Sequence, residues 1–305
     1  RKDRVREVVP PRRLLDHVVN APVIRRLERK LLNAGTVLSL SEHTERVLGK
    51  IAGPTFRSEV MPMPVDSELF HPDPAAVVPR RIGFAGRIDD PRKNIGLLVE
   101  SIGLLRQMGQ GVTALLIGGT PTDDVLAAVQ KLGLTDQIEF MAHVPGSELP
   151  RLLQTLDVFV LPSHQEGLCI AALEAMACGV PVVSTRCGGP EEFVIPGQTG
   201  LLVDFDAAAM AQAIQTIVGD SNLRQRLSSG ARQIIETQLS THPRVLVTPK
   251  SSVQIASVFE DAITLEIGLW INDLDNGQGR LISDLYLAIS TNLKSEDIPL
   301  SLSRQ

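Results

Sequence analysis

The chain has 305 residues, of which 43% are hydrophobic, 21% charged and 3% aromatic, and its formal net charge is −5. This length allows one large domain or two ordinary ones with full cores. No run of 18 apolar residues occurs, so no membrane-spanning helix is expected. The low aromatic content leaves few surfaces on which bases could stack, so nucleic acid is not expected as a partner.

Charge is distributed unevenly along the chain. Residues 1–30 hold ten Lys or Arg against four Asp or Glu, a balance of +6, which leaves −11 for the rest. A solvated helix face is the simpler interpretation of this basic edge. Weak association with an anionic membrane surface is the alternative. No apolar segment follows the basic start, so a secretory signal is not predicted.

Three cysteines, Cys169, Cys178 and Cys187, lie close together in the sequence. Their number is odd, and no histidine stands near them at the spacing of a metal site. We therefore expect reduced thiols in the core of a cytoplasmic protein.

The first predicted elements are a strand over Thr36–Leu40, a helix from Ser41 and a strand over Ser58–Met61. They read as the last β-α-β unit of one sheet. Prolines at 62, 64, 72 and 74 then mark a boundary. We expect an N-terminal segment with its linker over residues 1–75, a larger domain over 76–238 and a small tail domain over 239–305.

Short apolar strands alternate with amphipathic helices through the middle of the chain. The predicted strands are Arg81–Ala85, Val112–Gly118, Gln137–Phe140, Asp157–Leu161, Val180–Ser184 and Gly200–Val203. The predicted helices are Asn94–Met108, Asp123–Leu132, Gly146–Thr155 and Leu168–Ala177. Continuous apolar strands separated by helices indicate a doubly wound parallel α/β sheet covered on both faces. Ligands of such sheets bind at the carboxyl ends of the strands.

The tail after residue 240 has a different pattern. Ser252–Glu260 and Ala262–Ile271 predict two strands, and Arg280–Leu293 predicts a helix. The expected tail is therefore a small α+β domain.

Two carboxylates stand eight positions apart at Glu166 and Glu174, with Gly167 directly after the first. The glycine lets the backbone approach a ligand closely. The helix beyond it directs free N–H groups toward the same place. The two carboxylates would lie roughly 9–12 Å apart along that helix. This separation suits a ligand with a diphosphate between two groups that carry hydroxyls.

Arg87 and Lys93 follow the first strand of the central domain, in the sequence Gly86-Arg-Ile-Asp-Asp-Pro-Arg-Lys-Asn94. A loop at a strand end that supplies Arg and Lys before a helix is well placed to hold a diphosphate. Arg can fork onto two phosphate oxygens while Lys acts as a point charge. Arg92 is the neighbouring candidate, but the spacing favours Lys93.

These motifs together resemble the E-x7-E region of the retaining glycosyltransferases of family 4, which have the GT-B fold. Glu166–Val183 carries the resemblance. Phe84–Ile88, Cys187–Val194 and Gly197–Val203 extend it to about residues 36–236. The resemblance implies a Rossmann-like donor domain.

The resemblance also implies roles for individual residues. Arg87 and Lys93 would bind the donor phosphates and stabilise the leaving nucleotide. Glu174 would hold the ribose, and Glu166 the donor hexose. The remaining expected contacts with nucleotide sugar are made by Gly86, His143, Val144, Gly167, Leu168, Cys169 and Ile170.

Three further polar side chains, His164, Glu191 and Glu192, stand beside these motifs in the sequence. His164 follows a strand beside Glu166 and could line the sugar pocket. Glu191 and Glu192 open a short helix after two glycines, and both are expected to cap it.

The expected function is transfer of a hexose from a nucleotide-diphosphate sugar to an unknown hydroxyl acceptor, with retention of configuration. No cofactor and no metal are expected. A non-catalytic chain that binds nucleotide sugar is the alternative, because little of an acceptor-side domain precedes the linker. A dinucleotide oxidoreductase is disfavoured, because Gly83–Gly86 lacks the third glycine of the dinucleotide fingerprint.

The tail has a resemblance of its own. His242–Leu246, Leu265–Ile271 and Ser283–Ile289 are similar to the cytoplasmic C-terminal domain of small-conductance mechanosensitive channels. The channel's pore helix and β-domain do not appear in this sequence, so the resemblance does not imply conduction. A fusion, or a joining of two unrelated pieces, is expected, and a tail that acts as an oligomerising module is the alternative.

Overall fold

The computed structural model describes residues 21–60, 65–241, 252–258 and 263–268. The chain divides into two compact units, Arg1–Leu239 and Ser240–Gln305. In the second unit, β9 (Ser252–Val258) and β10 (Ile263–Gly268) form an antiparallel pair. The two predicted tail strands are thus confirmed over those residues. The helix predicted over Arg280–Leu293 lies outside the described ranges.

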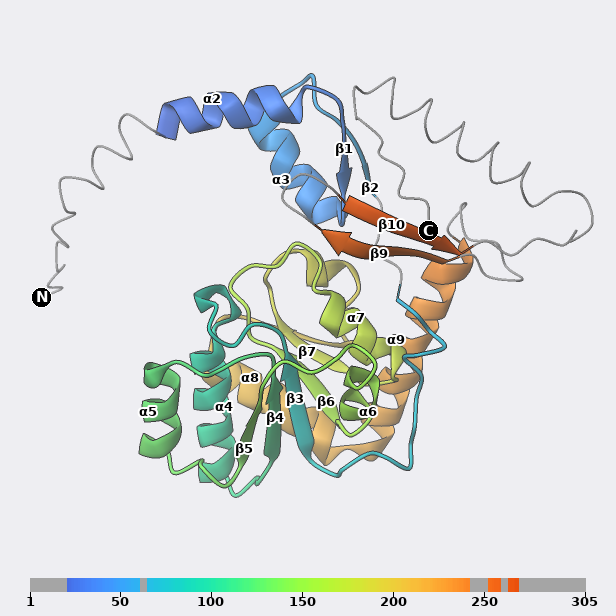
Figure 1. Ribbon diagram of the computed structural model, residues 1–305. Helices are drawn as coiled ribbons and strands as arrows, with labels where there is room; N and C mark the ends of the chain where they lie inside the picture. The colour runs from blue at the N-terminus through green and yellow to red at the C-terminus, as the bar shows by residue number, and fades with distance from the viewer. Residues whose placement is uncertain (1–20, 61–64, 242–251, 259–262, 269–305) are drawn as a thin grey trace, which may run out of the picture. The chain divides into compact units, whose positions relative to one another are not determined.

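Six parallel strands form the sheet of the first unit, in the order β5-β4-β3-β6-β7-β8 (Figure 1). The strands are β3 (Arg81–Ala85), β4 (Thr113–Ile117), β5 (Ile138–Met141), β6 (Val158–Leu161), β7 (Val182–Thr185) and β8 (Gly200–Val203). Every residue of β6 and β7 is buried. Buried runs of this kind are typical of parallel sheets covered on both faces. The predicted doubly wound α/β fold is confirmed.

Helices connect the strands and cover both faces of the sheet. They are α4 (Ile95–Gln107), α5 (Asp123–Lys131), α6 (Leu149–Leu153), α7 (Ile170–Ala177), α8 (Ala207–Gly219) and α9 (Ser221–Thr241). On one side α4 packs against α5 and α8, and elsewhere α6 packs against α7 (Figure 1). The apolar side chains of these helices and of the strands form one core.

The strand order reverses between β3 and β6. After β3 the chain winds toward β4 and β5, whereas after β6 it winds toward β7 and β8. At such a reversal the two following loops separate above neighbouring strands and leave a crevice at their carboxyl ends. The loops after β3 and β6 are therefore the first place to look for a ligand site.

The N-terminal segment contains α2 (Ala21–Leu32), β1 (Thr36–Ser39), α3 (Glu42–Ala52) and β2 (Arg57–Val60). Strands β1 and β2 pair in parallel, so the predicted β-α-β unit is confirmed. Ser41 caps α3 by accepting a hydrogen bond from the Thr44 backbone N–H. No helix within the described ranges is long and apolar enough to cross a membrane.

Some element boundaries differ from the prediction. Helix α7 begins at Ile170 instead of Leu168, because Cys169 has a left-handed backbone with φ 71° that a helix cannot include. Helix α6 covers only Leu149–Leu153 of the predicted Gly146–Thr155. Helices α8 and α9 were not predicted.

Candidate functional site

The two loops beside the strand reversal meet through one ion pair. Lys93, in the loop after β3, places its Nζ 2.7 Å from Oε1 of Glu166, in the loop after β6. The two side chains are only 18% and 10% exposed. Two of the predicted site residues, far apart in the sequence, therefore lie together at the strand reversal.

A short turn presents Lys93. The 3₁₀ turn η2 (Pro91–Lys93) begins after Asp90, whose carboxylate accepts a hydrogen bond from the Arg92 N–H at 3.0 Å. It ends at Asn94, which has a left-handed backbone with φ 51°. Asn94 also donates to the carbonyl of Pro162, at the end of β6, over 3.2 Å. This hydrogen bond and the ion pair thus both join the loop after β3 to the loop after β6.

Arg87 lies in the same loop and is 70% exposed. Its guanidinium pairs with Asp90 at 2.6 Å, and Arg92 pairs with the same carboxylate at 2.7 Å. Hydrogen bonds from the Arg92 side chain and backbone hold the pKa of Asp90 well below its usual range. Asp90 therefore stays ionised and holds two cationic side chains beside Lys93.

Glycines bring the ends of β3 and β4 close together. Gly86 has φ 153° and Gly118 has φ 116°. A Cβ on Gly118 would lie 2.3 Å from the Gly86 carbonyl oxygen. Because neither residue has a side chain, the backbones that follow β3 and β4 can pack directly against each other.

Glu166 is held on several sides. Its Oε1 accepts a second hydrogen bond from Oγ of the buried Ser163 at 2.6 Å. Its backbone N–H donates to the Cys187 carbonyl, and its own carbonyl accepts from the Gly189 N–H. The loop after β6 is thereby fixed to the loop after β7.

Gly188 and Gly189 make this contact possible. Gly188 has φ 111°, and a Cβ on Gly189 would lie only 2.0 Å from the Gly167 carbonyl oxygen. The two glycines therefore let two loop backbones touch beneath Glu166.

Glu174 has a different environment. It lies about one turn into α7. Burial raises the pKa of its carboxyl group. Among the described residues, no hydrogen bond or ion pair reaches this carboxylate. Leu168, just before α7, is buried in the core, whereas Gly167 and Ile170 are exposed.

The three cysteines are free thiols, and Cys178 and Cys187 are buried, as predicted. Burial raises the pKa of both Cys169 and Cys178 to about 12. Thiols with such pKa values stay protonated at neutral pH and are poor nucleophiles. The site therefore offers carboxylates and cations, without a reactive thiolate.

Comparison with known proteins agrees with this geometry. Residues 79–220 match the sequence profile of a family described as glycosyl transferases group 1. The matched residues contain all six strands of the parallel sheet, β3 to β8.

Named relatives share part of this chain. A GDP-mannose-dependent alpha-(1-6)-phosphatidylinositol monomannoside mannosyltransferase of Mycolicibacterium smegmatis is 34% identical over 65% of this chain and 56% of its own length. A D-inositol 3-phosphate glycosyltransferase of Salinispora arenicola is 32% identical over 60% of this chain and 46% of its own length. The chain thus spans about half the length of the curated relatives it matches.

Solved structures share the fold. A sucrose-phosphate synthase from Thermosynechococcus elongatus superposes with a TM-score of 0.65 at 29% identity, over 71% of this chain and 57% of its own. Anabaena HepE in complex with UDP and glucose gives 0.64 at 21% identity, over 71% and 63%. The C-terminal domain of a group 1 protein from Francisella tularensis gives 0.51 at 28% identity, over 57% and 97%.

Other predicted site residues lie on a different loop of the α/β domain. His143 and Val144 follow β5, the edge strand, and His143 is exposed. Within the described ranges no hydrogen bond, ion pair or ring contact joins them to Arg87, Lys93 or Glu166. The ring of His164 lies 5.5 Å from that of Phe205, a residue that the sequence analysis did not single out.

The N-terminal segment contacts the α/β domain at the loop after β6. Oγ of Ser41 donates to the Gly167 carbonyl at 2.6 Å. The Glu192 carboxylate accepts hydrogen bonds from the backbone N–H groups of Glu42 at 3.2 Å and His43 at 2.5 Å. Glu191 does cap its own turn, η3 (Gly189–Glu192), through the Gly188 N–H. The prediction for Glu192 is wrong, because this carboxylate caps α3.

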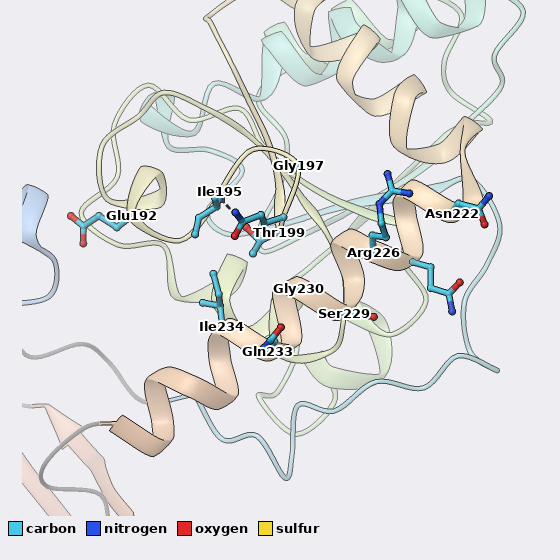
Figure 2. Close-up of a pocket in the computed structure, with 12 residues that line it drawn as sticks. Glu192, Ile195, Gly197, Thr199, Asn222, Arg226, Ser229, Gly230, Gln233 and Ile234 are labelled. Atoms are coloured by element: carbon cyan, nitrogen blue, oxygen red, sulfur yellow. Dashed lines mark hydrogen bonds between the residues drawn. The ribbon is translucent and has the colours of Figure 1, made fainter.

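An open groove of about 1160 Å³ lies elsewhere on the α/β domain. It runs between the loop before β8 and helix α9, and Figure 2 shows Thr199 on the loop and Arg226 and Gln233 on the helix. None of the predicted site residues lines it. Its walls mix amides and hydroxyls with isoleucines, glycines and two charged side chains, and it is separate from the Lys93–Glu166 ion pair.

Proposed function

We propose that the group 1 domain binds a nucleotide-diphosphate sugar and transfers its hexose to an acceptor hydroxyl with retention of configuration. The observation that carries this proposal is the Lys93–Glu166 ion pair across the crevice between β3 and β6. A cation and a carboxylate placed there can hold a phosphate and a hydroxyl group side by side. The names of the relatives support the same reaction class.

Each end of the ligand has a matching group. Arg87 and Lys93, with the N–H groups at the start of α7, would neutralise the diphosphate without a metal ion. Glu166 would accept hydrogen bonds from hexose hydroxyls. Glu174, a partly buried carboxylate, would accept them from ribose hydroxyls. His143 and Val144 would contact the base through their backbone.

In the proposed reaction the acceptor oxygen forms a bond to the anomeric carbon as the bond from that carbon to the diphosphate oxygen breaks. Both events take place on the same face of the sugar, so configuration is retained. The acceptor proton passes to the departing phosphate oxygen. Arg87 and Lys93 stabilise the charge that grows on the diphosphate, which is the principal electrostatic demand of the step.

The direct test is calorimetric titration of the purified chain with UDP, GDP and ADP. We expect saturable binding of one nucleotide, weakened at least tenfold by Glu174→Ala and by Arg87→Ala, since each removes a charged hydrogen-bonding group worth about 1.5–3 kcal/mol. Glu100→Ala and Arg151→Ala, at exposed positions on other helices, are matched controls. Equal binding by the parent and both site variants would overturn the proposal.

A non-catalytic nucleotide-sugar-binding chain is the second candidate. Turnover separates the two candidates: release of nucleotide from bound nucleotide sugar in the presence of hydroxyl acceptors supports the transferase. Tight binding with no release at any acceptor concentration supports the binding chain.

For the tail we propose an oligomerising module, supported by its separation as a compact unit and by its antiparallel strand pair. Sedimentation velocity of the full chain tests this. A monomer at all concentrations would contradict it.

A further inference from the structure

The two oxygens of the Glu166 carboxylate are used unequally. Oε1 accepts hydrogen bonds from Lys93 Nζ at 2.7 Å and from Ser163 Oγ at 2.6 Å. Within the described part of the chain, no donor reaches Oε2. An ionised carboxylate has about four acceptor positions, so both free positions on Oε2 can serve a ligand.

Ser163 cannot turn away to solvent. Its side chain is completely buried. Its carbonyl accepts a hydrogen bond of 2.5 Å from Oγ1 of Thr185, which is itself completely buried at the end of β7. The hydroxyl of Ser163 therefore has a fixed place, and Glu166 is its acceptor there.

The two donors on Oε1 differ in what a ligand can do to them. Lys93 is a flexible cation, and an incoming diphosphate competes with Glu166 for its charge. Ser163 is neutral and anchored in the core, so a phosphate group exerts no comparable pull on it. When Lys93 turns to the diphosphate, Ser163 is the group that keeps Glu166 in its observed rotamer.

We propose that Ser163 is a positioning residue that holds Oε1 of Glu166 so that Oε2 faces a hydroxyl of the donor sugar. This inference rests on the proposed function, because it assigns Ser163 to the sugar half of the same site. It predicts that Ser163 affects recognition of the sugar and leaves recognition of the nucleotide unchanged.

The test uses matched pairs of ligands: UDP with UDP-glucose, GDP with GDP-mannose, and ADP with ADP-glucose. For the pair that the parent chain binds, we expect Ser163→Ala to lower the affinity for the nucleotide sugar about tenfold. A loss of this size corresponds to loss of one hydrogen bond to a charged group. Affinity for the nucleotide alone should change less than about twofold. Ser101→Ala is the matched control. Ser101 is also completely buried, but its hydroxyl bonds to Leu97 within α4.

A double-mutant cycle shows whether Ser163 acts through Glu166. In a Glu166→Ala background, Ser163→Ala should cause no further loss of nucleotide-sugar affinity, because there is no carboxylate left to position. An equal loss in both backgrounds would overturn the inference, as would a Ser163→Ala chain that binds like the parent. If Ser163→Ala unfolds, Thr185→Val takes its place, with the same selective loss expected. A parent that binds no member of any pair refutes the proposed function itself.

Discussion

Glu166 and Glu174 carry the same chemical group at the two ends of one short motif, yet their surroundings are opposite. Glu166 has a cation and a hydroxyl on one oxygen, and its backbone is bonded to the next loop. Glu174 lies partly buried on α7 without a hydrogen bond or ion pair from any described residue. The Glu166 carboxylate has hydrogen-bond partners before a ligand arrives, whereas the Glu174 carboxylate has none among the described residues.

This difference separates two ways of preparing a site. Around Glu166 the folded chain supplies the partners, so the group is preorganised at little cost to folding. Around Glu174 the desolvation of the carboxylate opposes folding and is relieved only when donors arrive. The comparison predicts that changes near Glu166 lower stability, whereas neutralising Glu174 raises it.

The largest expected effect comes from forcing the loops beneath Glu166 apart. An alanine Cβ at position 189 would lie 2.0 Å from the Gly167 carbonyl oxygen, so the loop after β7 has to move. We expect Gly189→Ala to lower the free energy of unfolding by about 3 kcal/mol. Urea denaturation measures the change.

Gly96→Ala is the control for this substitution. Gly96 lies in α4 with no atom within 4 Å of a Cβ built on it. It should gain stability by about 0.5–1 kcal/mol because alanine is the better helix former. If Gly189→Ala were as stable as the parent chain, the loops after β6 and β7 would not be in close contact at Gly189 and Gly167.

Removing the cation should have the next largest effect. Lys93→Ala leaves the largely buried Glu166 carboxylate with Ser163 as its remaining side-chain donor among the described residues. We expect a loss of about 2 kcal/mol in unfolding free energy, less than for a fully buried pair. Lys131→Ala, at an exposed position at the end of α5, should change stability by less than about 0.5 kcal/mol. Equal losses for the two variants would remove the contrast between the two glutamates.

The sequence sufficed for the sheet, whereas the choice of Lys93 over Arg92 as a phosphate ligand stays a prediction. Apolar runs and loop motifs are local signals, and they give β3 and β8 their observed bounds. The contacts of Ser163, Thr185 and Ser41 were not predicted. Ser163 bonds to Glu166 only three residues away, but a buried serine has no sequence pattern of its own. Thr185 and Ser41 bond to positions that only the fold brings close. Glu192 was misassigned for the same reason, since its partner is a distant helix.

The start of α7 offers a smaller test of preorganisation. Cys169 has φ 71°, which costs about 1–2 kcal/mol for a residue with a Cβ and nothing for glycine. Cys169→Gly should therefore be more stable than Cys169→Ala by about 1 kcal/mol, after the greater flexibility of unfolded glycine is taken into account. Thermal unfolding of the two variants compares them directly. A more stable alanine variant would mean that residue 169 is not left-handed.

Glu174→Gln is expected to cause the smallest change in the free energy of unfolding. Whether that change is a gain or a loss is the most informative result. A raised pKa means that the folded chain binds the proton more tightly than the unfolded chain, so the contribution of Glu174 to stability falls as pH rises through that pKa. Glutamine removes this loss. The variant should be more stable than the parent at about pH 8, and the gain should shrink as pH falls into the ordinary carboxyl range near about 4.

Glu100→Gln, at an exposed position on α4, should show no such gain. The same Glu174→Gln chain should bind nucleotide more weakly, because an amide is a poorer acceptor for ribose hydroxyls than a carboxylate. Higher stability together with lower affinity would show that Glu174 contributes to ligand binding at the expense of stability. A loss of stability at about pH 8 would mean instead that the folded chain already supplies Glu174 with partners, and the contrast with Glu166 would be gone.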